Sequence, residues 1–238
     1  MPSSDPAARR PLKTRQSPFF RSVAALLARS GITPNAISFA SIVFACGAAI
    51  AFGRTVETGG AELRFWWLMA GACIQLRLIA NMLDGMVAVE GGRGGPTGDL
   101  WNEAPDRVSD TIILVAAGFG AGGAAWLGYS AALIAMFVAY VRALGASVGA
   151  GQLFLGPMAK PHRMFTLTVL CVAAAIFPHI NPSPEGRHVC FIRGFPDACV
   201  IPCTGTSLAL VIIIVGGMVT AARRLARISQ FLRSRSAR

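Results

Sequence analysis

Six apolar segments dominate the chain, and each is close to the length that a helix needs to cross a bilayer. A spanning helix takes about 20 apolar residues, and the lipid core admits only a backbone that satisfies its own hydrogen bonds. Charged residues make up 14% of the chain, below the roughly 25% usual in soluble domains. We therefore expect an all-α, polytopic membrane protein with about six transmembrane helices. The expected spans are residues 35–53, 64–83, 108–124, 126–147, 164–180 and 205–222, and the limits of the last two are loose by several residues.

The spans divide the chain into three expected parts. Residues 1–32 form a basic N-terminal segment, residues 33–224 the six-span membrane domain, and residues 225–238 a basic cytoplasmic tail.

The N-terminal segment contains apolar residues near helical spacing, with arginines between them. The apolar positions are Phe19, Phe20, Val23, Leu26 and Leu27. This pattern predicts an amphipathic interfacial helix on the cytoplasmic surface, and the alternative is a basic leader with no such role. Thr33-Pro34-Asn35 then breaks the helix and begins the first span.

Basic residues gather at both ends of the chain, where each cluster flanks an apolar span. The clusters are Arg9, Arg10, Lys13, Arg15, Arg21 and Arg29, and Arg223, Arg224, Arg227, Arg233, Arg235 and Arg238. Such clusters are typical of cytoplasmic ends that contact anionic lipid. With both termini inside, 17 of the 22 Lys and Arg residues lie in cytoplasmic segments. The net charge of +11 alone would suggest nucleic acid, but the placement of the basic residues beside apolar spans argues against it and predicts a lipid bilayer as partner.

The six cysteines fall into two groups. Cys46, Cys73 and Cys171 lie in apolar runs and are typical of packing residues. Cys190, Cys199 and Cys203 share a polar loop that is expected outside the membrane, where a disulfide could form. The chain has no CxxC pair, so we do not expect a zinc site.

Acidic residues are scarce, yet six of the eleven fall between residues 81 and 110. Asn81 and Asp84 are three apart and share one face at the end of the second span. The glycine-rich stretch "EGGRGGPTG" then breaks the helix. Asn102, Asp106 and Asp110 follow at a spacing of four and form one stripe on the next helix. We expect the two polar stripes to face each other across a cleft between the helices.

This acidic stretch suits a cation. Clustered carboxylates near a membrane repel one another unless something cationic lies between them. An all-oxygen donor set fits a hard divalent ion, namely Mg²⁺, Mn²⁺ or Ca²⁺. Asp110 lies deeper in its span, and a metal, a water held by Asn102, or a cation such as Arg77 must offset its charge. The alternative is acids that cap helices, which we expect of Asp99 and Glu103.

The same stretch resembles the signature of the CDP-alcohol phosphatidyltransferases, D-x-x-D-G-x-x-A-R followed after a gap by G-x-x-x-D-x-x-x-D. The matching positions here are Asn81, Asp84, Gly85, Ala88 and Val89, and then Gly98, Asn102 and Asp106. Five positions are kept at the right spacing, and the resemblance covers most of the chain from about residue 34 to residue 224.

This sequence departs from that signature at three positions. Asparagine replaces the first and third aspartates, which is similar to a subgroup of the family, and Val89 replaces the arginine. Asp110 could restore one of the lost negative charges. Arg93, or Arg77 within the second span, could replace the missing cation near a diphosphate.

Other stretches carry the same resemblance. Pro34 and Asn35 in "TPNAIS" resemble the family's PN-x-x-T/S start of the first span, near the nucleotide site. Arg142, Lys160 and Arg163 lie on the same cytoplasmic side, where the family binds phosphate-bearing substrates. The alternative for Arg142 and Arg163 is a topological role alone.

The resemblance implies an enzyme of phospholipid biosynthesis that moves a phosphatidyl group from CDP-diacylglycerol to an alcohol acceptor and releases CMP. It implies Mg²⁺ or Mn²⁺ as cofactor, Asp106 as catalytic base and a homodimer. The implied metal ligands are Asn81, Asp84, Asn102, Asp106 and Asp110. The implied substrate-binding residues are Pro34, Asn35, Gly85, Ala88, Arg93, Gly98, Arg142, Lys160 and Arg163. The implied location is a bacterial-type inner membrane with a cytoplasmic active site.

Two alternatives to this enzyme remain from the sequence. One is a catalytically inactive family member that binds a nucleotide lipid, which the two asparagines favour. The other is a small membrane transporter, although the polar residues gather at one interface rather than at the midplane. The sequence does not indicate the acceptor among glycerol phosphate, inositol phosphate, serine, another lipid or a further alcohol.

Overall fold

The computed structural model describes residues 17–90, 98–181, 188–190 and 200–236. Its main elements are α1 (Pro18–Arg29), α2 (Pro34–Glu57), α3 (Gly60–Glu90), α4 (Gly98–Phe119), α5 (Ala125–Ser147), α6 (Lys160–Ile176) and α7 (Gly205–Ser236). A short 3-10 turn, η3 (Pro178–Ile180), and a small antiparallel pair, β1 (His188–Cys190) and β2 (Val200–Pro202), lie between α6 and α7. The expected all-α architecture is confirmed, with this one small hairpin added.

Helices α2 to α7 correspond to the six expected spans. Within the described residues, four of them, α2, α3, α5 and α7, are long and apolar enough to cross a membrane by length and composition. Helix α4 begins with the polar half of the acidic stretch, and α6 has 17 residues. The count of six spans therefore remains a prediction.

The helices around the acidic stretch extend well beyond their expected spans. Helix α3 continues through Glu90, and α4 begins at Gly98. Helix α7 likewise runs without a break into the expected tail and ends at Ser236. The acidic residues consequently sit on regular helix, which fixes their side chains relative to one another.

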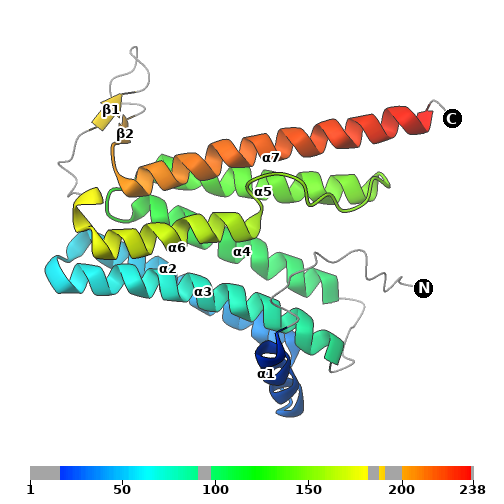
Figure 1. The fold of residues 1–238 in the computed structure, drawn as a ribbon, viewed down its shortest axis with the longest axis horizontal. Coiled ribbons are helices and arrows are strands. Elements are labelled where there is room, and N and C mark those ends of the chain that lie inside the picture. The colour runs from blue at the N-terminus through cyan, green and yellow to red at the C-terminus, as the bar shows by residue number, and fades with distance from the viewer. Residues whose placement is uncertain (1–16, 91–97, 182–187, 191–199, 237–238) are drawn as a thin grey trace.

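The helices pack lengthwise into a bundle (Figure 1). Helix α2 packs on α3 and α4, α3 on α6, α4 on α5, and α5 on α7. Small residues allow these close approaches, as expected of helices packed in lipid. At the α4–α5 crossing, a Cβ atom added to Gly118 would lie 2.8 Å from the Cα atom of Gly128, so any larger residue at this position would separate the two helices.

Helix α1 lies against the bundle near the end that carries the acidic stretch (Figure 1). Its Ala24 is buried with Met82, Leu83 and Met86 of α3. Phe19 and Leu26 remain 67% exposed. The expected amphipathic helix is therefore present, and its placement on a membrane surface remains a prediction.

The connection from α1 to α2 follows the sequence expectation. The Thr33 side chain caps α2 by accepting a hydrogen bond from the backbone N–H of Ala36 at 3.2 Å, and Pro34 is the first helical residue. A proline suits this position because its missing N–H would have no partner inside the helix.

The cysteines are only partly described. Cys73 and Cys171 are buried, as expected, whereas Cys46 is exposed on the outside of the bundle. Cys203 carries a free thiol. Cys199 and the side chain of Cys190 lie outside the described residues, and a disulfide in this loop stays a prediction.

Candidate active site

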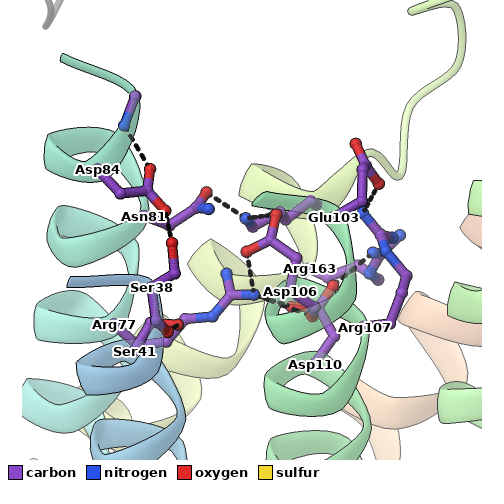
Figure 2. A network of polar contacts seen from close by, with 12 residues as sticks. Ser38, Ser41, Arg77, Asn81, Asp84, Glu103, Asp106, Arg107, Asp110 and Arg163 are labelled. Atoms are coloured by element: carbon purple, nitrogen blue, oxygen red, sulfur yellow. Dashed lines mark hydrogen bonds and ion pairs between the residues drawn. The ribbon is translucent and has the colours of Figure 1, made fainter. Parts of the chain in front are cut away.

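The polar ends of α3 and α4 face each other, and four of the expected site residues lie between them (Figure 2). Asp84, Asp106 and Asp110 are buried, and Asn81 is half-buried. Each charge therefore needs a partner inside the protein, because a buried and unpaired carboxylate is costly.

Asp84 is held by helix α2. Its Oδ2 accepts a hydrogen bond from the Ser38 hydroxyl at 2.7 Å, and its Oδ1 accepts one from the backbone N–H of Gly85 at 2.5 Å. Ser38 is the serine of the stretch "TPNAIS", one turn after Pro34. Ser38 was not among the expected site residues, although its position in that stretch is the signal that points to it. The contact ties the start of the first span to the first half of the acidic stretch.

Lys160, the first residue of α6, joins the two halves of the stretch. Its ammonium donates to Asn81 Oδ1 on α3 and, at 2.5 Å, to Asp106 Oδ2 on α4. Burial lowers the pKa of Lys160 to about 8, and the charge of Arg77 acts in the same direction, while Asp106 and Asp110 oppose it. The expected cleft is thus bridged by a protein cation.

Arg77 lies deeper between the helices and is fully buried. Its Nη2 atom lies 3.1 Å from Asp106 Oδ1 and 2.9 Å from Asp110 Oδ1, and it donates to the backbone oxygen of Asp106 at 3.1 Å. One guanidinium therefore neutralises two carboxylates that stand one helical turn apart.

Arg163 completes the pairing of Asp110 from helix α6. Its Nη2 donates to Asp110 Oδ2 at 2.8 Å, and its Nη1 donates to the Met158 backbone oxygen at 3.3 Å. Both oxygens of Asp110 thus lie within 3 Å of an arginine. Among the offsets expected for this carboxylate, the described side chains favour cations, with Arg77 joined by Arg163.

Arg142 extends from α5 toward the start of α4. It pairs with Glu103 at 2.5 Å, and Arg107 pairs with the same carboxylate at 3.0 Å. Although burial acts to raise its pKa, the charges of Arg142 and Arg107 hold the pKa of Glu103 below its ordinary value. Glu103 therefore does more than cap the helix start, which was its expected role.

The remaining expected residues are spread around this centre. Pro34 and Asn35 begin α2, Gly85 and Ala88 lie on α3, and Gly98 begins α4. Asn102 lies on α4 one turn before Asp106, and its side chain is outside the described part. Arg93 is outside the described residues altogether.

The fit of a divalent ion can be judged from the donor set. Asn81, Asp84 and Asp106 offer oxygen atoms from facing helices, which suits a hard cation. Within the described residues, however, no three His, Cys, Asp or Glu side chains gather around one point, and Lys160 stands between Asn81 and Asp106. The donor set thus suits a hard cation in its chemistry, and the Lys160 ammonium occupies the position between two of its members.

Comparison by sequence finds no match, since neither a protein-family model nor a curated protein matches the chain. Solved structures do match in fold. The phosphatidylinositol phosphate synthase PgsA1 of Mycobacterium tuberculosis with CDP-DAG bound has a TM-score of 0.65 at 16% identity, over 89% of this chain and 94% of that chain.

Two further structures of the same mycobacterial protein match similarly. Its complex with manganese and citrate has a TM-score of 0.65 at 17% identity, over 88% of both chains. Its apo form has a TM-score of 0.62 at 16% identity, over 87% of this chain and 94% of that chain. The likeness extends over nearly the whole length of both chains, and at these identities it shows a shared fold.

Proposed function

We propose that this protein is a membrane-embedded CDP-alcohol phosphatidyltransferase that moves a phosphatidyl group from CDP-diacylglycerol to an alcohol acceptor and releases CMP. One observation carries the proposal. Asn81 on α3 and Asp106 on α4, from the two halves of the signature-like stretch, meet at the Lys160 ammonium. The fold shared with a phosphatidylinositol phosphate synthase supports it, because one structure of that protein has CDP-DAG bound.

The reaction replaces the phosphoanhydride bond of the diphosphate by a phosphate ester bond to the acceptor. The acceptor hydroxyl attacks the β-phosphorus of CDP-diacylglycerol, a new P–O bond forms, and the bond to the bridging oxygen of the diphosphate breaks so that CMP leaves. The hydroxyl must lose its proton during this attack. A positioned carboxylate performs such a transfer when it reaches the hydroxyl.

We assign the proton transfer to Asp106. Arg77 holds its Oδ1, whereas its Oδ2 faces the more accessible Lys160. In the proposed reaction Oδ2 turns to the acceptor hydroxyl and takes up its proton. Arg77 keeps the rest of the carboxylate in place, since a charge-assisted hydrogen bond to a buried arginine has a fixed geometry.

The proposed cofactor is Mg²⁺ or Mn²⁺. When bound, such an ion neutralises the charge that develops on the diphosphate during transfer. Asn81, Asp84, Asn102 and Asp106 would hold it. The complex of the structurally similar protein with manganese is consistent with a divalent ion. We do not assign Asp110 to the metal ligands, because its Oδ1 is ion-paired with Arg77 and its Oδ2 with Arg163. Its proposed role is to hold these two arginines in place.

The proposed substrate-binding surface surrounds this centre. Pro34, Asn35, Gly85, Ala88 and Gly98 would line the nucleotide and diphosphate side, where small residues permit close approach of a ligand. The basic residues Arg93, Arg142 and Lys160 would face phosphate groups. Arg163 lies behind Asp110 in the structure, and its proposed contribution is indirect.

The proposed setting is a bacterial-type inner membrane with both termini and the active site on the cytoplasmic side. The basic ends of the chain support this orientation. The acyl chains of the substrate then stay in the bilayer while the diphosphate reaches the ends of α3 and α4. We also propose a homodimer, on the resemblance alone.

A direct assay tests the function and identifies the acceptor. The purified protein in detergent is supplied with CDP-diacylglycerol, Mg²⁺ or Mn²⁺ and a panel of alcohols that includes glycerol phosphate, inositol phosphate and serine. Mass spectrometry should detect one new phospholipid together with stoichiometric CMP. Absence of CMP release with every acceptor, from a protein that still binds CDP-diacylglycerol, would favour the inactive nucleotide-lipid binder suggested by Asn81 and Asn102.

A further inference from the structure

Lys160 occupies a position that its charge alone does not explain. It is the first residue of α6, where the helix dipole places partial positive charge and disfavours a cation. Its ammonium is nevertheless drawn in between Asn81 and Asp106, on two other helices. These are two oxygen donors that a divalent ion would use at the same place.

The charges of the inner site, which excludes Glu103 and its partners Arg107 and Arg142, are already balanced. Three carboxylates, Asp84, Asp106 and Asp110, stand against three cations, Arg77, Lys160 and Arg163. A divalent ion added to this set would leave a surplus of positive charge in a largely buried site. Such a surplus is costly, so the entry of the ion favours the departure of one cation.

Lys160 is the cation that is able to leave. The side chains of Arg77 and Arg163 are 0% and 2% exposed, and both are held by Asp110. The Lys160 side chain is 17% exposed and lies at the start of its helix. A lysine carries its charge on a flexible four-carbon stem, whereas Arg77 and Arg163 are buried and each donates to two protein oxygens.

We propose that Lys160 is a resident cation that occupies the position between Asn81 and Asp106 and is displaced when a divalent ion binds there. The inference rests on the proposed function for the presence of the ion. Displacement leaves the ammonium tethered beside the site without its carboxylate. The diphosphate of CDP-diacylglycerol offers it a new partner, so the ion and the nucleotide lipid bind cooperatively.

Manganese binding to the purified protein in detergent tests the displacement, with electron paramagnetic resonance counting free Mn²⁺. Lys160→Met keeps an unbranched side chain one atom shorter and removes the competing charge, and it should tighten Mn²⁺ binding about tenfold or more. Arg142→Met is the matched control, because it removes a nearby cation that pairs with Glu103 instead. It should change the affinity by less than about threefold, since its charge is already paired with Glu103 and does not lie between Asn81 and Asp106.

Equal effects of the two substitutions, or an unchanged or weaker affinity in Lys160→Met, would overturn the proposal. So would the absence of Mn²⁺ binding from every variant at millimolar ion. Lys160→Gln replaces Lys160→Met if the latter does not fold, as judged by its melting temperature.

A second measurement examines the cooperativity and separates the inference from the function. Adding CDP-diacylglycerol in mixed micelles should tighten Mn²⁺ binding more in the wild type than in Lys160→Met. Only the wild type has an ammonium that can leave Asp106 and pair with the diphosphate. An equal gain in both proteins overturns this part. CMP release by the wild type with an unchanged Mn²⁺ affinity in Lys160→Met would leave the function standing and the inference refuted. Tighter Mn²⁺ binding by Lys160→Met, together with no CMP release by the wild type, would refute the function alone.

Discussion

The guanidinium of Arg77 on α3 contacts Asp106 on α4 twice, at the Oδ1 atom and at the backbone oxygen, each at 3.1 Å. The same Nη2 atom reaches Asp110 at 2.9 Å. A fully buried arginine thus sets the position of the carboxylate to which we assign the proton transfer. The site and the packing of α3 on α4 depend on the same contact.

Arg77→Met should destabilise the protein strongly. The substitution leaves Asp106 and Asp110 with fewer buried partners, and breaking a buried ion pair on one side costs about 3–5 kcal/mol. We expect a clear fall in the thermal unfolding temperature in detergent. Arg54→Met is the control, because Arg54 pairs with Glu57 on an exposed surface, where a pair contributes little.

A second substitution separates the contribution of the Arg77–Asp110 ion pair to stability from the effect of lost side-chain volume. Asp110→Asn should cost less in the Arg77→Met background than in the wild type, since the carboxylate has then lost one of its two arginines. Additive effects of the two changes would show that the ion pair contributes nothing beyond packing.

Asp106→Asn and Asp84→Asn should each abolish CMP release while the protein stays folded. Asp106 loses its capacity to accept the proton, and positioned acid–base groups contribute about 10²–10⁴-fold to the rate. Asp84 loses the charge with which we expect it to hold the ion. The measurement is CMP formation together with the melting temperature, and Glu57→Gln, on an exposed helix end, is the control. Near wild-type turnover in either variant would remove that residue from the proposed site.

The helices and the two halves of the acidic stretch could be predicted from the sequence, because hydrophobic length and local spacing determine them. The spacing of Asn81 and Asp84 is a property of one helix. The glycine-rich break correctly predicted a second helix, although α3 and α4 both extend further into the polar region than the apolar runs do.

The cation partners could not be predicted in the same way. Asp106 contacts Lys160, which lies 54 residues away in the sequence, and Asp110 contacts Arg163, which lies 53 residues away. These contacts arise because α6 packs on α3 and extends Lys160 and Arg163 toward α4, which no local pattern encodes. The positive-inside rule explains why basic residues lie on that side, but not which of them turn inward. For this reason Arg163 was expected to face substrate, whereas the structure shows it paired with Asp110.

Asn81→Asp and Asn102→Asp would restore the aspartates of the signature. We expect tighter binding of Mg²⁺ or Mn²⁺, because each change adds a negative charge among the proposed ligands. We do not expect either change to create activity from none. The measurements are ion affinity and CMP release by the single and double variants. A wild type without activity beside an active double variant would establish that the natural chain is an inactive binder.

Asp110 provides the last prediction, because two roles for it lead to different results. As a metal ligand it would compensate for the charge lost at Asn81 and Asn102, and Asp110→Asn would weaken ion binding. In the structure its Oδ1 and Oδ2 face Arg77 and Arg163, at 2.9 and 2.8 Å. An oxygen paired with a buried arginine is a poor ligand, since the ion would have to separate an ion pair inside the protein.

We therefore expect Asp110→Asn to act on stability rather than on the ion. Its loss leaves Arg163 with only the Met158 backbone oxygen among its described contacts, and the melting temperature should fall. The affinity for Mn²⁺ should change by less than about threefold, the effect of one distant and paired charge. Asn102→Asp should not rescue the variant, because a carboxylate two turns away on α4 lies too far along the axis, about 12 Å, to pair with Arg163. Marked weakening of Mn²⁺ binding by Asp110→Asn, restored by Asn102→Asp, would instead place Asp110 among the metal ligands.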